Sequence, residues 1–283
     1  MSKIDLHMHS SNSDGTNPPE ELLKLVRNAG IKIFALTDHD TINGAMVLKN
    51  EPNFIKGIEF SCITQNNHKC HILGLGYDEN NKDFQDALKA GEELRHEKFY
   101  RRIGFLRSEF KITFTDQEIE DLLKIPSVGK PHIGNLLVKK GYANSRAEAI
   151  DNYVDLAKTG NDKISAELAI NAINSAGGVS VWAHPLGGER DPELPENDFR
   201  KILDELKNYG LRGLECYYSK YSYVKTKWLA DVANDNKLFI SGGSDYHGTN
   251  KKIPLGRLNS DDEEIAPELL TILDALNFNK GSD

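Results

Sequence analysis

Residues 3–10 read KIDLHMHS, and SNSDG follows at residues 11–15. In the first five of these residues, Ile4 and Leu6 alternate with polar residues, a pattern that is typical of a β-strand. Residues two apart in a strand face the same side, so His7 and His9 at its end point in one direction. Asp14 comes just beyond them. The histidines are either a ligand pair or an ordinary surface or core pair, and the rest of the chain decides between these interpretations.

Short apolar runs alternate with amphipathic stretches toward both ends of the chain. Apolar periodicity and terminal glycines predict helices at residues 18–30, 165–177, 199–210 and 222–236. Further strands are predicted at residues 31–40, 53–62, 68–77, 177–185, 211–218 and 236–247, with the third and fourth strands of the chain close enough for a hairpin. This alternation predicts an α/β fold with a mostly parallel sheet, either a barrel or an open doubly wound sheet.

The middle of the chain has a different pattern. Residues 84–110, 115–124, 132–143 and 145–154 are helical and charged in pattern, and no convincing central strand interrupts them. We therefore expect a helical subdomain at residues 84–160, inserted into an α/β domain made of residues 1–83 and 161–283.

Composition narrows the class of protein. The 283 residues include 35 Lys and Arg against 43 Asp and Glu, a formal net charge of −8, which argues against broad nucleic-acid binding and against duplex DNA as a partner. Cys62, Cys70 and Cys216 form no CxxC pair, so neither a zinc ribbon nor a disulfide framework is expected. Without a signal-peptide core or an 18-residue apolar run, no membrane association is expected, and the cytoplasm is the simplest location. The sequence does not indicate an oligomeric state.

Histidines and carboxylates gather at the ends of the predicted strands, where parallel α/β folds assemble their active sites. Six of the nine histidines lie at such ends. Mixed imidazole and carboxylate ligands suit zinc, manganese or iron better than calcium or magnesium. The candidate metal ligands are His7, His9, Asp14, His39, Glu59, His71, His184, Asp245 and His247.

Each of these motifs also has an ordinary structural interpretation. Asp14 precedes glycine, which is common in turns, and His184 precedes proline, which also suits a turn. The SDYHG motif at residues 244–248 could cap a helix. All of these interpretations would have to hold together, so a shared metal site is the better hypothesis.

The motifs DLHMHSSNSDG, ALTDHDT, GIEFS, HILGLGY, VWAHP and GGSDYHG, in this order, resemble those of the polymerase and histidinol phosphatase (PHP) family of metal-dependent phosphoesterases. The resemblance covers both ends of the chain. It implies a distorted (β/α)7 barrel of the TIM type with two or three divalent metals. Manganese is the expected metal, with iron or zinc as alternatives.

The resemblance also implies roles for single residues. His7, His9, Glu59 and Asp245 would hold one metal, while Glu59, His71 and His184 would hold a second, and Asp14, His39 and His247 a third. Two metals about 3.5–4 Å apart can share a hydroxide and bind a phosphate oxygen. The implied mechanism is therefore attack by a metal-bridging hydroxide at a position that Glu59 holds. Asp38 and Asp40 could orient imidazole N–H groups, or could be solvated loop caps.

The inserted segment discriminates among phosphoesterases. A polymerase fused to such a domain would be far longer, and plain histidinol phosphatases usually lack an insert at this place. The layout most resembles a subgroup that removes the 3′-phosphate of nucleoside 3′,5′-bisphosphates, some of whose members are 5′→3′ exoribonucleases on short RNA. We expect a small phosphorylated substrate, a nucleotide or a short 5′-phosphorylated RNA. A histidinol phosphatase and a metal- or nucleotide-binding regulatory module without turnover remain alternatives.

Candidate substrate contacts come from the insert and from one strand end. Lys130 and His132 stand at a predicted helix N-terminus, a place that favours anions, and the resemblance suggests that they touch the substrate. Arg101 and Arg102 lie in a basic helix, most of whose charges are expected to be solvated. Tyr218 ends a predicted strand and Ser219 follows it; they could bind a base or a phosphate, or pack under the insert.

Overall fold

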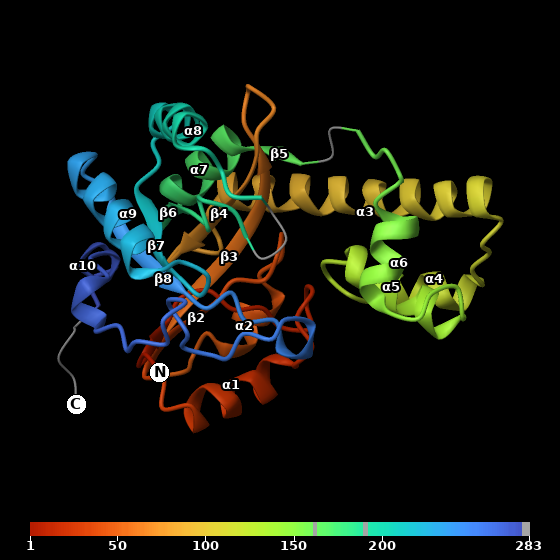
Figure 1. Ribbon diagram of the computed structural model, residues 1–283, viewed down its shortest axis with the longest axis horizontal. Helices are drawn as coiled ribbons and strands as arrows, with labels where there is room; N and C mark the ends of the chain where they lie inside the picture. Colours follow the sequence, from red (N-terminus) through yellow and green to blue (C-terminus); the bar gives the residue numbers. More distant parts are fainter. Residues whose placement is uncertain (161–162, 189–191, 279–283) are drawn as a thin grey trace.

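The computed structural model describes residues 1–160, 163–188 and 192–278 (Figure 1). The strands are β1 Ile4–Asp5, β2 Ile33–Leu36, β3 Phe54–Ile63, β4 Lys69–Leu75, β5 Ile164–Ser165, β6 Val179–Trp182, β7 Gly213–Tyr218 and β8 Phe239–Gly243. The helices are α1 Pro19–Asn28, α2 Asn43–Leu48, α3 Lys82–Phe110, α4 Asp116–Leu123, α5 Lys130–Lys139, α6 Arg146–Ala149, α7 Ala166–Ser175, α8 Glu196–Asn208, α9 Tyr223–Asp235 and α10 Ile272–Ala275.

Among the described residues, eight strands form one curved sheet; seven follow the order β1-β2-β3-β4-β6-β7-β8, and β5 pairs with β3 off this path. The two edge strands approach each other, because Leu6 N–H donates to the Gly242 carbonyl at 3.2 Å and Met8 forms a parallel bridge with Tyr246. The sheet is therefore a nearly closed barrel, and the predicted fold class, a distorted TIM-like barrel with an inserted helical segment, is confirmed.

The predicted hairpin accounts for part of the distortion. Strand β4 runs antiparallel to β3, from Gly57 opposite Leu75 to Ile63 opposite Lys69, and also antiparallel to β6. Strand β5 was not predicted, since two residues carry no readable periodicity; it pairs with the far end of β3 at Cys62 and Ile63.

Apolar side chains line the inner face of the barrel below the polar residues. On β4, Leu73 and Leu75 share a face with His71, and both are fully buried. Leu270 and Leu273, near the C-terminus, pack into the same cluster. The barrel interior is thus filled at one end and carries polar groups at the other.

Helix α3 connects the barrel to the inserted helices. Its 29 residues form one continuous helix, with Asn81 capping the start and Lys111 in the left-handed conformation at the end. Phe84 and Ala87, early in α3, pack on the barrel helices, whereas Phe99 and Leu106 belong to a separate hydrophobic cluster with α4, α5 and α6. Figure 1 shows the far half of α3 extending away from the barrel with these helices beneath it.

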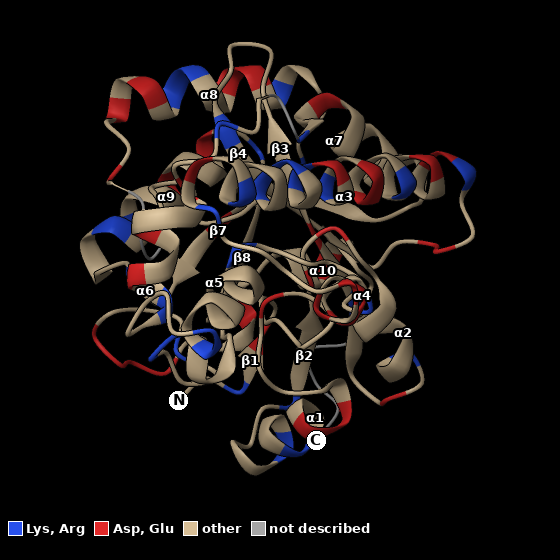
Figure 2. Ribbon diagram, turned by 90° about the vertical axis from the view of Figure 1, so that its right-hand side faces the viewer, with Lys and Arg blue, Asp and Glu red and all other residues tan. Residues whose placement is uncertain are grey.

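This separate cluster favours an inserted unit at residues 84–160, although α3 itself crosses the expected boundary at residue 84. Residues 161 and 283, which bound the second barrel segment, lie outside the described residues. In Figure 2, basic and acidic segments alternate along α3 and α8. Helix α3, the first inserted helix, which the sequence suggested to be basic, therefore also carries acidic side chains. Within the described part of the chain, no helix is both long and apolar enough to cross a membrane.

Candidate metal centre

Glu59 lies at the centre of a cluster of imidazoles. Its Oε2 is 3.1 Å from both His9 Nε2 and His39 Nδ1, and 3.3 Å from His7 Nε2. Its Oε1 is 2.9 Å from His71 Nδ1 and 3.1 Å from His184 Nε2. One buried carboxylate therefore faces five ring nitrogens.

His71 reaches this cluster by a route that the sequence did not predict. It was expected at or just past the C-terminal end of a strand, but it is the third residue of β4. Because β4 runs antiparallel to its neighbours, the beginning of this strand lies at the edge of the barrel where the parallel strands end. The expectation of its place in the strand was wrong, yet the side chain lies with the others.

Two further carboxylates extend the cluster. Asp14 Oδ1 lies 3.0 Å from His247 Nε2 and 3.7 Å from His9 Nδ1. Asp245 Oδ1 lies 3.4 Å from His9 Nε2 and 3.6 Å from His7 Nε2. The structure thus brings together all nine residues that the sequence singled out as metal ligands.

The donor atoms fit metal ions better than they fit one another. Two ligands bound to one metal at about 2.1 Å lie roughly 3–3.4 Å apart, which matches the separations around Glu59. Buried polar atoms are almost always hydrogen-bonded. In the described residues, His7 Nε2, His9 Nε2, Asp14 Oδ1, His39 Nδ1 and Glu59 Oε2 are buried without a hydrogen bond.

Three groups of these atoms are compact enough to hold a cation each. They share His9, His39 and Glu59, so neighbouring cations would lie close together. The groups are His9, Asp14, His39 and His247; His7, His9 and Glu59; and His39, Glu59 and His71.

The electrostatics of the cluster favour ionised carboxylates. Burial opposes ionisation of Glu59, but the imidazoles of His39, His7 and His71 outweigh it and hold the pKa of Glu59 well below its ordinary value. Burial likewise opposes ionisation of Asp14, yet His247 and His39 hold its pKa well below the ordinary value. A set of charged carboxylates among imidazoles is suited to binding cations.

Glu215 supports two of the imidazole residues and was missed at the sequence level. Its fully buried carboxylate lies 2.9 Å from His7 Nδ1 and accepts a hydrogen bond from the backbone N–H of His184 at 2.6 Å. The only sequence clue is an acidic residue within the apolar run 213–218. With Nδ1 of His7 engaged, Nε2 is the nitrogen left to face Glu59.

Asp38 and Asp40 have different partners from those expected. Asp38 accepts hydrogen bonds from Ser10 Oγ at 2.7 Å and Ser13 Oγ at 2.5 Å, and Ser13 Oγ in turn lies 3.4 Å from His9 Nδ1. Asp40 accepts from Arg95 and from the Ser61 N–H at 2.7 Å. Among the described residues neither carboxylate hydrogen-bonds an imidazole directly, so any orienting effect is indirect.

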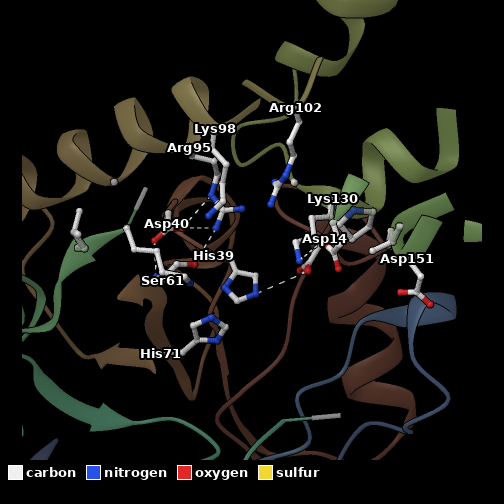
Figure 3. Close-up of a pocket in the computed structure, with 17 residues that line it drawn as sticks. Asp14, His39, Asp40, Ser61, His71, Arg95, Lys98, Arg102, Lys130 and Asp151 are labelled. Atoms are coloured by element: carbon white, nitrogen blue, oxygen red, sulfur yellow. Dashed lines mark hydrogen bonds and ion pairs between the residues drawn. The ribbon is translucent and has the colours of Figure 1, made fainter. Parts of the chain in front are cut away.

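A cavity of about 710 Å³ opens between the metal-ligand cluster and the inserted helices. Figure 3 shows Arg95, Lys98 and Arg102 extending from α3 toward His39, with Lys130 and Asp151 on the other wall. The cavity is lined by Asp14, His39, Asp40, Ser61, His71, Gly91, Arg95, Lys98, Arg102, Gly129, Lys130, Pro131, Ile150, Asp151, Asp155, Lys163 and Ile164.

The structure brings only two of the expected substrate contacts to this cavity, Arg102 and Lys130. Arg101 is exposed, does not line the cavity, and donates to Glu97 and to the Thr159 carbonyl. Tyr218 and Ser219 are buried away from the cavity, and half-buried His132 does not line it, so contact of these three residues with substrate stays a prediction.

Each of these three residues has other surroundings in the structure. Tyr218 is fully buried and donates to Asp245 Oδ2 at 2.9 Å. Ser219 is 4% exposed and does not line the cavity. His132 Nδ1 accepts the Gly129 N–H at 2.9 Å, and its ring also hydrogen-bonds the Ser13 backbone.

Lys98 and Lys163 are cavity residues that the sequence did not single out. Lys163 follows the insert directly, and burial lowers the pKa of its ammonium group. Isolated lysines in charged segments carry no sequence signature of a pocket, so only the fold could place them here.

A nearly closed α/β barrel with a His, Asp and Glu cluster at the carboxyl ends of its parallel strands has the architecture of a metal-dependent hydrolase. Comparison with known proteins identifies the group: the PHP domain matches residues 5–167, and the chain belongs to this family of metal-dependent phosphoesterases.

Relatives at moderate identity carry different activity names, among them a phosphoribosyl 1,2-cyclic phosphate 1,2-diphosphodiesterase of Eggerthella lenta, 26% identical over 88% of this chain and 96% of that protein. The chain is 30% identical to a 5′-3′ exoribonuclease of Haemophilus influenzae, over 90% of this chain and 93% of that protein. It is 29% identical to a 3′,5′-nucleoside bisphosphate phosphatase of Chromobacterium violaceum, over 87% of this chain and 88% of that protein. A crystal structure from Bifidobacterium adolescentis, assigned as a metal-dependent phosphoesterase, is 26% identical with a TM-score of 0.77, covering 99% and 96% of the two chains.

Proposed function

We propose that this phosphoesterase removes the 3′-phosphate of nucleoside 3′,5′-bisphosphates with two or three divalent metals, manganese first among them and iron or zinc as alternatives. The proposed ligands share buried, convergent nitrogen and oxygen atoms around Glu59 and Asp14. They are His7, His9, Asp14, His39, Glu59, His71, His184, Asp245 and His247.

The residues of the chain supply position and charge. Bound divalent metals would polarise the phosphate and lower the pKa of a water. Glu59, with both oxygens facing imidazoles, is suited to bridging two cation positions. Tyr218 and Lys251 both contact Asp245 Oδ2, at 2.9 Å and 2.6 Å, and leave Oδ1 directed at His7 and His9.

The observation that carries the substrate proposal is the charged cavity beside the ligand cluster, whose described lining holds five basic side chains beside four aspartates, with Lys130 paired to Asp155. Arg102 and Lys130 stand on its walls, and Asp14, His39 and His71 form its floor. A substrate that fills both parts needs one phosphate at the metals and a second anionic group at the insert. The volume of about 710 Å³ is typical of small-molecule sites, which span roughly 300–1,000 Å³.

The residues that line the cavity also indicate how strongly the base of a nucleotide substrate would be recognised. Apart from His39 and His71, the described lining residues include no aromatic ring, and Pro131, Ile150 and Ile164 supply most of the apolar surface. We therefore expect phosphate contacts to dominate recognition, with little discrimination among bases.

A 5′→3′ exoribonuclease acting on short 5′-phosphorylated RNA is the second candidate, favoured by the name of the 30%-identical relative. In that case the group at the insert would be the 5′-phosphate, and the scissile bond would be the phosphodiester that follows.

The test is phosphate release from a nucleoside 3′,5′-bisphosphate with added Mn²⁺, beside a 5′-phosphorylated oligoribonucleotide resolved as a ladder. We expect release from the bisphosphate and none from a His7→Ala control. Lys130→Met should raise KM for the bisphosphate about tenfold, whereas Lys124→Met, an exposed lysine of the same insert paired with Asp121, should not. Release only from the oligomer would select the exoribonuclease, and release from neither would refute both.

A further inference from the structure

The inserted helices contact the barrel at three of the loops that carry metal-ligand candidates. These loops bear Asp14, His39 and His247, which together with His9 form one of the three compact groups. The insert contacts thus concentrate at the loops of one ligand group, whereas Glu59 and His71 lie within strands of the barrel.

The first contact fixes the loop of Asp14. The Ser127 N–H, just before α5, donates to the Asn12 carbonyl at 2.9 Å. His132, in the first turn of α5, accepts the Gly129 N–H through Nδ1 at 2.9 Å, and its ring also hydrogen-bonds the Ser13 backbone. The insert thus holds both residues that precede Asp14.

The second contact fixes the turn after His247. Arg146, at the start of α6, donates to the Asn250 carbonyl at 2.8 Å. The Asn250 side chain donates to the Asp14 carbonyl at 2.6 Å, and the Asn250 N–H donates to the His247 carbonyl at 3.3 Å. Arg146 therefore braces a residue that links two ligand-bearing loops.

The third contact reaches the residue after His39. Arg95, on α3, forms an ion pair with Asp40 and also donates to Ser61 Oγ at 3.1 Å. Asp40 has a φ of 49°, in the left-handed region that a non-glycine residue adopts only when its surroundings hold it there.

The other ligand candidates rest on the barrel. Glu59 and His71 lie within β3 and β4, whose ladder runs unbroken from Gly57 to Ile63. His7 is held by Glu215 of β7. Strands supply these positions. The loops of Asp14 and His247 hydrogen-bond the insert, and His39, which forms a parallel bridge with Glu59, has its neighbour Asp40 paired with Arg95 of the insert.

We propose that the inserted helices assemble the third cation site, so that Arg146 is a positioning residue for the group of Asp14, His39 and His247. Without the hydrogen bond from Arg146, Asn250 no longer holds the loops of Asp14 and His247 at a fixed distance from each other. The ligands around Glu59 keep the positions that the strands give them. The proposal concerns the metal centre and holds whichever phosphoester is the substrate.

The experiment measures metal content, not turnover. Wild type and variants of the full chain are stripped with chelator, dialysed against a series of Mn²⁺ concentrations and analysed for metal per chain. We expect three sites in the wild type. In Arg146→Ala the third should bind at least tenfold more weakly, in the range seen when outer partners of metal ligands are removed, with the other two unchanged.

Arg101→Ala is the matched control, because Arg101 is also an insert arginine that donates to a backbone carbonyl, that of Thr159. It should bind all three ions like the wild type. Arg146→Lys, which keeps one donor within reach of the same carbonyl, should recover part of the lost affinity. The proposal is overturned if Arg146→Ala binds three ions with wild-type affinity, if it loses all sites together, or if the wild type itself binds only two.

Discussion

A single buried carboxylate, Glu215, determines how two of the imidazole residues are presented. Its side chain is fully buried between His7 Nδ1 and the His184 N–H. A carboxylate at this distance from Nδ1 favours the tautomer whose Nδ1 carries the proton, which leaves Nε2 as an acceptor for a cation. The residue would never touch substrate, yet it sets the geometry at the cluster.

Replacing Glu215 with glutamine should weaken metal binding and catalysis together. The amide keeps the shape but loses the charge that orients His7, so we expect about a 10–100-fold weaker affinity for Mn²⁺ and a similar fall in kcat, with KM little changed. Calorimetric Mn²⁺ titration and steady-state kinetics measure the two effects. Glu196→Gln, an exposed glutamate paired with Arg200, is the control, and equal behaviour of both variants would contradict the role.

Residue identities at the cluster could be predicted, but their surroundings could not. Histidines and carboxylates at strand ends are visible in the sequence, and all nine come together. Tyr218 was expected to face the substrate. Strand β7 contains an irregularity between Glu215 and Tyr217, and this local shift accompanies a Tyr218 directed at buried Asp245. Such a bulge breaks the two-residue alternation on which the sequence argument depends.

At the level of elements, α3 is the shared component of barrel and insert. Phe84 lies in the barrel cluster and Leu106 in the insert cluster, on one helix without a break. A continuous helix transmits the loss of packing at one end to the other, so we expect the two parts to unfold together.

Leu106→Ala should therefore destabilise the whole molecule. Leu106 is fully buried, and truncations of this kind cost about 2–5 kcal/mol. Both tryptophans, Trp182 and Trp228, pack in the barrel cluster, so their fluorescence reports the barrel, while circular dichroism also reports the helical insert. In urea, both transitions should move to lower concentration by the same amount.

Leu156→Ala is the control for this variant, since Leu156 is 51% exposed just after the insert's last helical turn. Its effect should stay within about 0.5 kcal/mol. If the fluorescence midpoint of Leu106→Ala remained at the wild-type value while the dichroism midpoint fell, the insert would unfold independently and the coupling through α3 would be refuted.

The elements themselves were largely predictable, because each carries its own periodicity. The hairpin of β3 and β4 and the helices of the insert appear where the sequence placed them. Strand β5, with two residues, and the π-helical turn at Ile150–Val154 have no such pattern, since both depend on packing against distant segments.

On the scale of the whole molecule, closure of the barrel is a long-range event. Asp5 accepts hydrogen bonds from Ser244 Oγ at 2.6 Å and from the Gly256 N–H at 2.8 Å, and so joins the first strand to the region after the last. Local pattern cannot predict a pairing between residues so far apart, which is why the sequence left a barrel and an open sheet as alternatives until the family resemblance was considered.

The same long-range assembly makes the metals part of the stability of the fold. Segments from both ends of the chain bring buried carboxylates and imidazoles together at Glu59, and a cation bound only by the folded state stabilises it by about 2.7 kcal/mol at 100 times its Kd. One filled site should raise Tm by roughly 5–10 °C, at about 2–4 °C per kcal/mol for a chain of this size.

Differential scanning calorimetry of chelated and Mn²⁺-loaded protein measures the shift. Ca²⁺ at the same concentration should give a much smaller one, because nitrogen-rich ligands suit it poorly. His7→Ala should lose most of the Mn²⁺ effect, whereas His68→Ala, outside the cluster, should keep it; a Tm that does not respond to Mn²⁺ in the wild type would show that the folded chain does not need the cations to hold these groups together.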